Sequence, residues 1–193
     1  IIQAFSFFII PVFLMIWLTS NEKPMHYLRL DRKTKPVVLL LAVAIVFAAQ
    51  PFNNWIGYVN SKMLLPEWLQ ALESWLKGKE EQAADLTKAL LKLTSLSDMF
   101  VKIIIVALLP ALGEELLFRG VVQKLFGKWL NNVHAAIILT AVLFSAMHIQ
   151  FYGFLPRMMM GVGLGYMFAF TGSLWVPILA HFVNNASIVV FTY

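Results

Sequence analysis

Three ionisable side chains, Glu114, Glu115 and Arg119, lie inside a strongly apolar part of the sequence. A charge at the centre of a bilayer costs about 3 kcal/mol or more, and such residues usually face a bundle interior or a water-filled cavity. Positions four apart share one helix face, so we expect Glu115 and Arg119 to pair, while Glu114 is rotated by about 100° and points elsewhere. This predicts one carboxylate held by arginine and one free to act as a base. The alternative is a purely structural clamp between helices.

Two further polar pairs repeat the four-residue spacing in later apolar segments. His148 follows Phe144 by one turn, and His181 precedes Asn185 by one turn. A lone histidine in a membrane segment is more often a hydrogen-bonded packing residue than a catalyst. Two histidines with an asparagine and the free Glu114 can supply a base for water and donors where negative charge develops.

The positions of the turns favour a shared site. If the two segments around residues 127–132 form a hairpin, Glu114 and His148 lie at similar depth. With straight helices His181 is offset by about 10 Å at 1.5 Å rise per residue. A tilt, or a bend around Gly153–Pro156, must remove this offset.

The composition indicates a polytopic membrane protein, because 60% of the residues are hydrophobic. The absence of cysteine excludes a thiol nucleophile, disulfides and Cys-ligated zinc. We attribute the net charge of +5 to loops facing anionic lipid rather than to nucleic-acid binding. The sequence has no His-Glu-x-x-His zinc motif and no Gly-x-Ser-x-Gly nucleophile elbow.

We predict an all-α fold: a transmembrane helical bundle with an amphipathic interfacial insertion. Apolar runs of about 17–25 residues are long enough to cross a bilayer. About six such runs are present, at roughly 1–19, 36–52, 99–126, 133–149, 154–171 and 174–192. The chain starts and ends at such runs, so we expect it to be a fragment of a longer polypeptide.

The connections between these runs predict an orientation. Residues 20–35 hold the densest basic cluster, which favours the cytoplasmic side, and alternation places Lys124 and Lys128 on that side too. The stretch 53–97 then faces the opposite side.

Within residues 60–95, a helix starting near Pro66 would align Trp68, Leu72 and Trp75 on one face. This pattern is typical of an amphipathic helix in the headgroup region, anchored by tryptophan. A helical loop packed on the bundle and a substrate-gating lid are the alternatives.

Other residues of the apolar segments have simpler interpretations. Gly161 and Gly165 are four apart, the small-residue pattern of close helix packing. We expect Arg157 to reach the membrane interface with its charged end, and His134 to cap a helix or to lie at a helix interface.

The ordered set of motifs resembles the CPBP family, the CAAX-protease and bacteriocin-processing (Abi) intramembrane proteases. The resemblance covers about residues 97–192 and implies a catalytic helical core at 97–193. Residues 1–96 are not covered by it, and we expect them to supply N-terminal membrane segments and the amphipathic helical loop. The motifs are Glu114-Glu115-x-x-x-Arg119, Phe144-x-x-x-His148 and His181-x-x-x-Asn185.

The resemblance implies an intramembrane endopeptidase that hydrolyses peptide bonds of membrane-associated proteins or peptides. It implies these roles: Glu114 activates water with help from His148, His181 and Asn185 stabilise the oxyanion, and Glu115 with Arg119 shapes the site. It also favours a multi-pass protein of a prokaryotic inner or cell membrane. If the orientation above holds, leader peptides or membrane-protein segments are better substrates than cytosolic CAAX proteins.

Three alternatives stay open. Glu114, His148 and His181 could form a zinc site with an open position for water. We prefer a mechanism without a cofactor, because no His-x-x-x-His pair exists to bind metal from one helix. A membrane peptide-binding or immunity protein that does not cleave, and a proton-coupled transporter, are the others.

Overall fold

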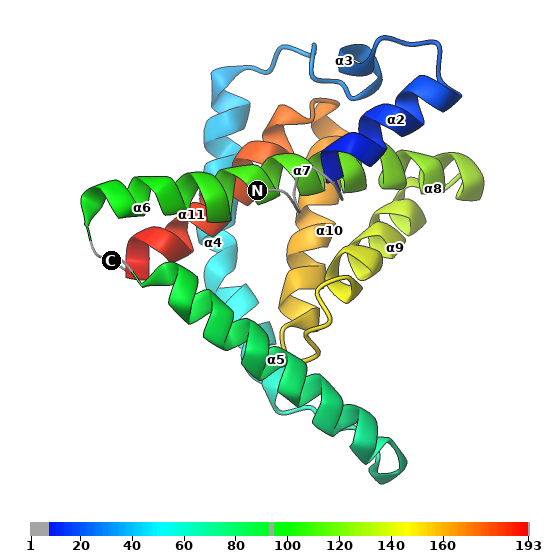
Figure 1. Cartoon of the computed structure of the whole chain (residues 1–193). Coiled ribbons are helices and arrows are strands. Elements are labelled where there is room, and N and C mark those ends of the chain that lie inside the picture. Colours follow the sequence, from blue (N-terminus) through cyan, green and yellow to red (C-terminus); the bar gives the residue numbers. More distant parts are fainter. Residues whose placement is uncertain (1–7, 93–94, 193) are drawn as a thin grey trace.

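The computed structural model describes residues 8–92 and 95–192, with only the backbone described for Leu90. In that part of the chain every regular element is helical (Figure 1), which confirms the predicted all-α fold. The elements are α2 (Ile10–Thr19), α3 (Pro24–Tyr27), α4 (Pro36–Ser61), η2 (Glu67–Leu69), α5 (Gln70–Leu91), α6 (Leu96–Lys102), η3 (Ile103–Leu108), α7 (Leu109–Leu117), η4 (Phe118–Val122), α8 (Gln123–Leu130), α9 (Val133–Ala146), α10 (Phe154–Thr171) and α11 (Trp175–Thr192).

Local sequence signals set several helix ends. Proline, whose fixed φ suits the first turn of a helix, opens α2, α3 and α4. Before α9, the Asn132 side chain accepts the backbone N–H groups of His134 and Ala135. Asn132 therefore caps this helix, and His134 instead lies at a helix interface with its Nδ1 atom 2.8 Å from the Tyr166 hydroxyl. α10 ends at Gly172, whose φ of +65° suits glycine.

Three of the described helical stretches have the length and composition of membrane spans: Pro36–Ser61, Leu96–Leu130 and Trp175–Thr192. The other predicted segments are also largely helical over their described residues, although α9 ends at Ala146, before the predicted end at 149, and residues 1–7 lie outside the description. The predicted end of the second segment at residue 52 was wrong, because α4 continues through Pro51 to Ser61. Pro51 removes only one backbone hydrogen bond, which a helix in an apolar setting tolerates.

The glutamates lie on one helical stretch of 35 residues, from α6 to α8. At 1.5 Å per residue it is about 50 Å long, far more than the bilayer core. In Figure 1 it runs across the view while α4 and α10 stand upright. Two π-helical segments, η3 and η4, interrupt it. η3 precedes Pro110, which cannot donate a backbone hydrogen bond, and η4 contains Arg119.

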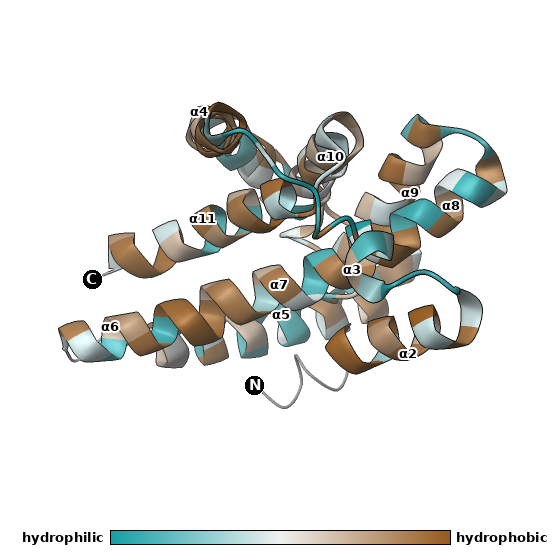
Figure 2. Cartoon of the chain, turned by 90° about the horizontal axis from the view of Figure 1, so that it is seen from above, coloured by the Kyte–Doolittle hydropathy of each residue, from teal (hydrophilic) through white to brown (hydrophobic). Residues whose placement is uncertain are grey.

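The predicted hairpin joins α8 to α9. It turns at Asn131, which has a left-handed backbone with φ of +49°, a conformation that asparagine tolerates better than most residues. α10 packs on α9, and α11 returns beside η3, α7 and α4. Seen from above in Figure 2, apolar colour covers most of α2, α4 and α6, and many of their large apolar side chains are exposed. Such faces suit contact with lipid chains.

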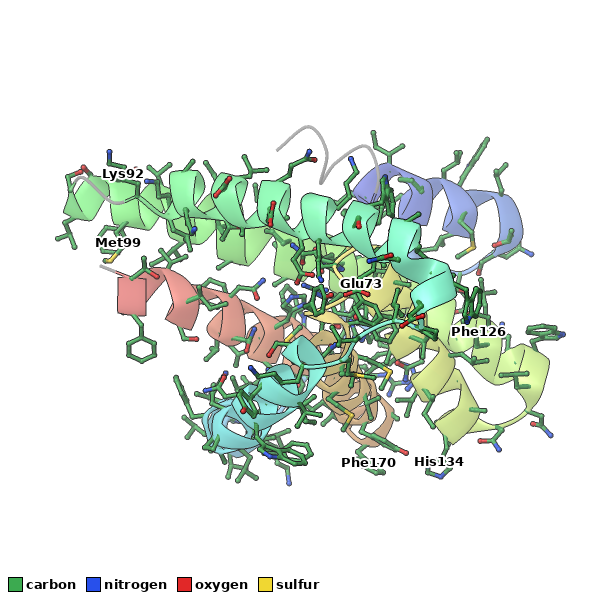
Figure 3. All side chains as sticks on the ribbon, turned by 90° about the horizontal axis from the view of Figure 1, so that it is seen from below. Glu73, Lys92, Met99, Phe126, His134 and Phe170 are labelled. Atoms are coloured by element: carbon green, nitrogen blue, oxygen red, sulfur yellow. The ribbon has the colours of Figure 1, made fainter. Side chains whose placement is uncertain are left out.

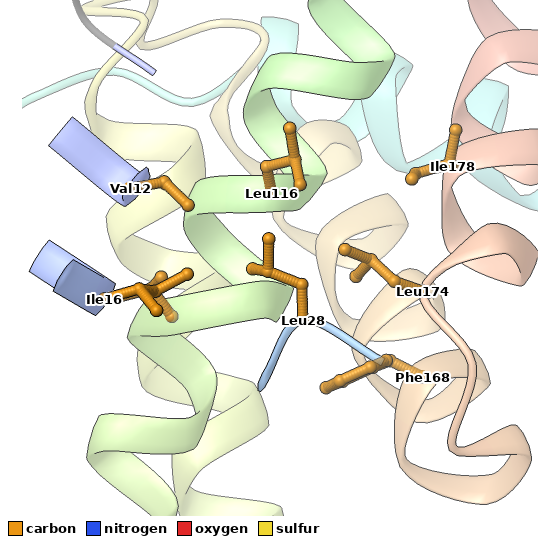
Figure 4. Packing of buried hydrophobic residues seen from close by; sticks show 8 residues of the cluster. Val12, Ile16, Leu28, Leu116, Phe168, Leu174 and Ile178 are labelled. Carbon is orange, nitrogen blue, oxygen red and sulfur yellow. The ribbon is translucent and has the colours of Figure 1, made fainter. Parts of the chain in front are cut away.

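One apolar cluster joins the N-terminal helices to the core. Val12 and Ile16 of α2, and Leu28 after α3, pack against Leu116 and Leu174 (Figure 4). Further members of the cluster are Val121, Phe168 and Ile178. Next to it, the Lys124 ammonium donates to the Tyr27 carbonyl. The basic loop of residues 20–35 therefore contacts Lys124, which alternation predicts to lie on the same side, and the cytoplasmic location of that side stays a prediction.

Helix α5 meets the remainder of the protein through its polar face. The Tyr152 hydroxyl donates to Glu73 at 2.9 Å, and the Tyr152 backbone N–H donates to Glu80 at 3.0 Å. Figure 3, seen from below, shows Glu73 where α5 crosses the helices behind it. Trp68 and Trp75 are exposed. The tryptophan face of this amphipathic segment is thus exposed, and polar hydrogen bonds secure the opposite face. Its location in a headgroup region stays a prediction.

Candidate active site

A cavity of about 310 Å³ brings together residues from all three motifs. Glu114 from α7, His148 from the loop after α9, and His181 and Asn185 from α11 line it. Further lining residues are Asn53 of α4, Pro156 and Arg157 of α10, and Asn184 of α11. The depth offset foreseen for His181 is therefore absent, because α11 runs beside α7.

The two neighbouring glutamates have different surroundings. Glu115 is fully buried, and its Oε1 atom accepts a hydrogen bond from Arg119 Nη1 at 2.7 Å. Glu114 lines the cavity with 13% of its side chain exposed. One carboxylate is thus paired with arginine and the other faces the cavity, as the spacing predicts.

His181 links the two carboxylates. Its Nδ1 atom lies 2.8 Å from Glu115 Oε1, and its Nε2 atom lies 3.8 Å from Glu114 Oε2. Because the Glu115 carboxylate can only accept, Nδ1 is the donor in this contact. The ring is thereby fixed in one orientation with Nε2 toward Glu114, the arrangement by which carboxylates orient catalytic histidines.

Phe144 packs against all the rings of the site. Its ring lies under the Arg119 guanidinium, 5.0 Å from centroid to Cζ. It also meets the rings of His148 and His181 edge-on, at centroid distances of 5.3 and 5.9 Å. Phe144 therefore keeps the two histidines apart and covers the buried charge of Arg119, which explains why an aromatic residue stands at this position.

His148 lies beyond the end of α9 and is exposed at the cavity. Its Nδ1 atom is 2.9 Å from the Phe144 carbonyl, which can only accept, so Nδ1 donates and Nε2 carries the free electron pair. The next residue, Ile149, has a φ of +54°. A β-branched residue in this left-handed region is strained, and such strain persists only where surrounding contacts impose it.

Asn60, at the end of α4, bonds the chain just after Ile149. Its side chain is buried, donates to the Phe151 carbonyl at 3.0 Å and accepts the Leu155 N–H at 2.7 Å. Ser145 adds a 2.7 Å hydrogen bond to the Phe154 carbonyl. Hydrogen bonds from α4 and from α9 therefore hold the loop that carries His148 and the start of α10.

A chain of amides reaches Asn185. Gln50 of α4 donates to Asn184 Oδ1 at 3.1 Å, and Asn184 Nδ2 donates to Asn185 Oδ1 at 3.2 Å. Because the Asn185 oxygen is engaged, its amide NH₂ group is free to donate into the cavity.

Gly161 and Gly165, which the sequence predicts to pack closely, also supply backbone hydrogen-bond acceptors. A methyl group on Gly165 would come within 2.8 Å of Ile137, and one on Gly161 within 3.1 Å of Ala141, so α9 and α10 pack closely there. The carbonyl of Gly161 also accepts from Arg119 at 2.9 Å, and that of Gly165 from Gln123 at 3.1 Å. Two donors four residues apart on one helix thus match two carbonyls four apart on the other.

The Arg157 side chain lines the cavity, and its Nη1 atom is buried with no hydrogen-bond partner among the described residues. Its Nη2 atom donates to Gln150. Its reach to the membrane interface stays a prediction. The sequence analysis missed Gln50, Asn60 and Gln123. Each is a polar side chain within a membrane-length apolar helix, and that is the signal that would have found them.

The predicted zinc ligands do not form a ready-made metal site. Within residues 8–92 and 95–192, no three His, Asp or Glu side chains gather closely enough to hold a metal ion. A zinc site with three protein ligands needs bond lengths of about 2.0–2.2 Å to nitrogen and oxygen, so all three donors must converge on one point. The donor set present here does not meet that requirement.

Comparison with known proteins agrees with this geometry. Residues 96–187 match a family model described as "Type II CAAX prenyl endopeptidase Rce1-like". The chain is also 35% identical over 88 residues to the uncharacterized protein YpbD of Bacillus subtilis (strain 168). That alignment covers 44% of this chain and 42% of YpbD, so the chain spans less than half the length of this relative. No solved structure matches the chain.

The family match covers Glu114, His148 and Asn185 together with the other residues of the three motifs. It confirms the resemblance to the CAAX-protease and bacteriocin-processing intramembrane proteases over this stretch. The description of that family implies a protease, and together with the three candidate spans it supports an integral membrane protein.

Proposed function

We propose that this chain is an intramembrane endopeptidase that hydrolyses peptide bonds of membrane-associated proteins or peptides. One observation carries the proposal: Glu114, His148, His181 and Asn185 line a single cavity. These side chains provide a base, an assisting histidine and hydrogen-bond donors, the groups that amide hydrolysis needs.

Glu114 is the proposed base. It is the cavity's carboxylate without an arginine partner at hydrogen-bond distance, since Arg119 bonds Glu115. A water molecule beside Glu114 gives its proton to the carboxylate as the oxygen attacks the substrate carbonyl carbon. His148 assists by accepting a hydrogen bond from this water at Nε2, because its Nδ1–H is engaged by the Phe144 carbonyl.

Attack moves the carbonyl π electrons onto oxygen and produces a tetrahedral oxyanion. Asn185 donates to this oxygen through its free NH₂ group. Collapse of the intermediate breaks the C–N bond, and Glu114 returns its proton to the leaving amine. The products are a new carboxylate and a new N-terminus.

Glu115 and Arg119 position His181 in this scheme. The Glu115 carboxylate accepts from both side chains, which fixes the imidazole with Nε2 toward Glu114. His181 donates to the oxyanion at Nε2 only when the ring carries both protons, so Asn185 is the donor that serves in either state.

An apolar pocket beside the cavity supports a membrane-associated substrate. Residues of α4 and α10, among them Ile45, Phe52 and Met159, line this pocket, and Asn53, Met160 and Asn184 border both spaces. An apolar substrate segment in this pocket would place the adjoining peptide bond in the catalytic cavity. We expect leader peptides or membrane-protein segments as substrates.

The test compares new protein N-termini in membranes that express the wild type, Glu114→Gln or Glu67→Gln. Glu67→Gln makes the same chemical change at an exposed residue of η2. New termini should appear with the wild type and Glu67→Gln and be absent with Glu114→Gln. Identical profiles for all three, at equal expression, would contradict the proposal and favour a peptide-binding or immunity protein.

A further inference from the structure

Arg157 is a half-buried cation that the proposed mechanism leaves without a role. It lies in the first turn of α10 and lines the same cavity as Glu114 and Asn185. Its guanidinium packs over Gly153, where a methyl group would come within 3.1 Å of Nη2. Glycine at position 153 therefore leaves room for the side chain to fold back over the loop.

One edge of this guanidinium is prepared for a ligand. Nη2 donates to Gln150, whereas Nη1 is buried and has no partner among the described residues. A buried donor left unsatisfied destabilises the protein, and the cost is larger when the donor is charged. Arginine stays protonated in proteins, so it cannot escape this cost by losing its charge.

The oxyanion of the proposed reaction lacks a permanent cationic donor. The Nδ1–H of His181 is engaged by Glu115, and its Nε2 atom donates only in the doubly protonated ring. Asn185 provides a neutral N–H group. A charged donor in the same cavity would be roughly twice as strong as a neutral one, and it would be in place before the negative charge develops.

We infer that Arg157 is a further catalytic residue of the proposed endopeptidase, whose Nη1–H donates to the oxyanion of the tetrahedral intermediate. The inference rests on the proposed function. Arg157 transfers no proton: it stabilises the electron pair that moves from the carbonyl bond onto oxygen and releases it when the C–N bond breaks. The alternative ligand, a substrate carboxylate, would make Arg157 a binding residue instead.

Steady-state cleavage kinetics in proteoliposomes test this assignment, with one peptide substrate supplied as the C-terminal acid and as the amide. Removing one oxyanion donor typically lowers kcat by about 10²–10³-fold. Arg157→Gln should lower kcat by this factor on both substrates and change KM by less than about threefold, while Arg157→Lys restores part of kcat. A raised KM confined to the free acid would assign Arg157 to a substrate carboxylate and overturn the inference.

Two control variants exclude a structural explanation. Gln150→Ala removes the side chain that accepts from Arg157 but keeps the charge of Arg157. Lys128→Gln removes an exposed cation of α8 that does not line the cavity. Both should keep kcat within about threefold of the wild type. If Gln150→Ala lowers kcat as much as Arg157→Gln does, Arg157 acts only by tying the loop, and the inference fails.

A binding measurement separates this inference from the proposed function. A peptide phosphonate carries a tetrahedral anion at the position of the scissile carbonyl. Arg157→Gln should weaken its binding at least tenfold, and the parent peptide by less than threefold. If the wild type releases no product but shows this difference, the protease fails and the anion site stands. If Glu114→Gln abolishes cleavage while Arg157→Gln changes neither kcat nor phosphonate binding, only Arg157 is misassigned.

Discussion

The Nδ1 atom of His181 lies 2.8 Å from the Oε1 atom of Glu115, 66 residues earlier in the chain. The same oxygen accepts from Arg119 at 2.7 Å. One oxygen of the second glutamate, Glu115, therefore accepts two hydrogen bonds, and the first glutamate, Glu114, faces the cavity. Two adjacent residues of one helical stretch thus provide a carboxylate that holds His181 and a carboxylate that faces the cavity.

Removing Arg119 should destabilise the protein strongly. Arg119 and Glu115 are both fully buried, and breaking a buried ion pair costs about 3–5 kcal/mol because one charge stays unpaired. We expect Arg119→Gln to lower the free energy of unfolding by about that amount. The double variant Arg119→Gln/Glu115→Gln should lose much less than the sum of the single losses. Additive losses in denaturant unfolding of the solubilised protein would show that the pair is not coupled.

Glycine at position 165 should be needed for packing. In Gly165→Ala the new methyl would lie 2.8 Å from Ile137 and 3.0 Å from Gln123, and such overpacking costs about 1–3 kcal/mol. Gly163 has nothing within 4 Å, so Gly163→Ala should be neutral or slightly stabilising. Thermal unfolding compares the two variants directly. Equal melting temperatures would contradict the close approach of α9 and α10.

Asn60 should influence cleavage from outside the cavity. Asn60→Ala removes one hydrogen bond to the loop that carries His148 and one to the start of α10, each worth about 1 kcal/mol. We expect faster hydrogen exchange in residues 148–155 and lower kcat. Asn54→Ala, the same change at an exposed position of α4, is the control. Unchanged exchange in Asn60→Ala would show that the loop does not depend on this residue.

The sequence predicted the parts of the site that follow helical spacing. The Glu115–Arg119 pair and the glycine packing both come from residues four apart, and the hairpin at Asn131 comes from the polar break between two apolar runs. Contacts between distant segments were not predictable in this way. Asn60 bonds a loop about 90 residues later, and Arg157 turns inward only because Gly153 leaves space for it.

Helix α5 should loosen at acidic pH. Hydrogen bonds from Lys77 and then Tyr152 lower the pKa of Glu73. A lowered folded-state pKa contributes stability above the unfolded value of about 4.3, and this is lost as the pH falls through the folded value. Hydrogen exchange in residues 70–91, corrected for intrinsic rates, should be constant from about pH 7 to 5 and rise below about pH 4. Glu73→Gln should show the raised exchange at every pH, and Glu67→Gln should behave as the wild type. Hydrogen exchange that stays constant down to pH 3 would show that the ionised Glu73 does not hold α5 in place.

Metal removal should leave the proposed activity in place. In the described part of the chain, Glu114, His148 and His181 do not gather as a preformed ligand set. We expect chelator-treated, metal-depleted protein in liposomes to keep its cleavage rate within about twofold, and added Zn²⁺ to give no stimulation. Loss on chelation with recovery on stoichiometric Zn²⁺ would favour the zinc mechanism.

The most direct test of the account is the cleavage rate of purified protein in liposomes, with a substrate identified from the new N-termini. Glu114→Gln should lower the rate by about 10³-fold or more while it keeps the melting temperature of the wild type, since Glu114 is the proposed base. Glu67→Gln should match the wild type. Cleavage by Glu114→Gln at a wild-type rate would contradict the central claim that Glu114 activates the attacking water.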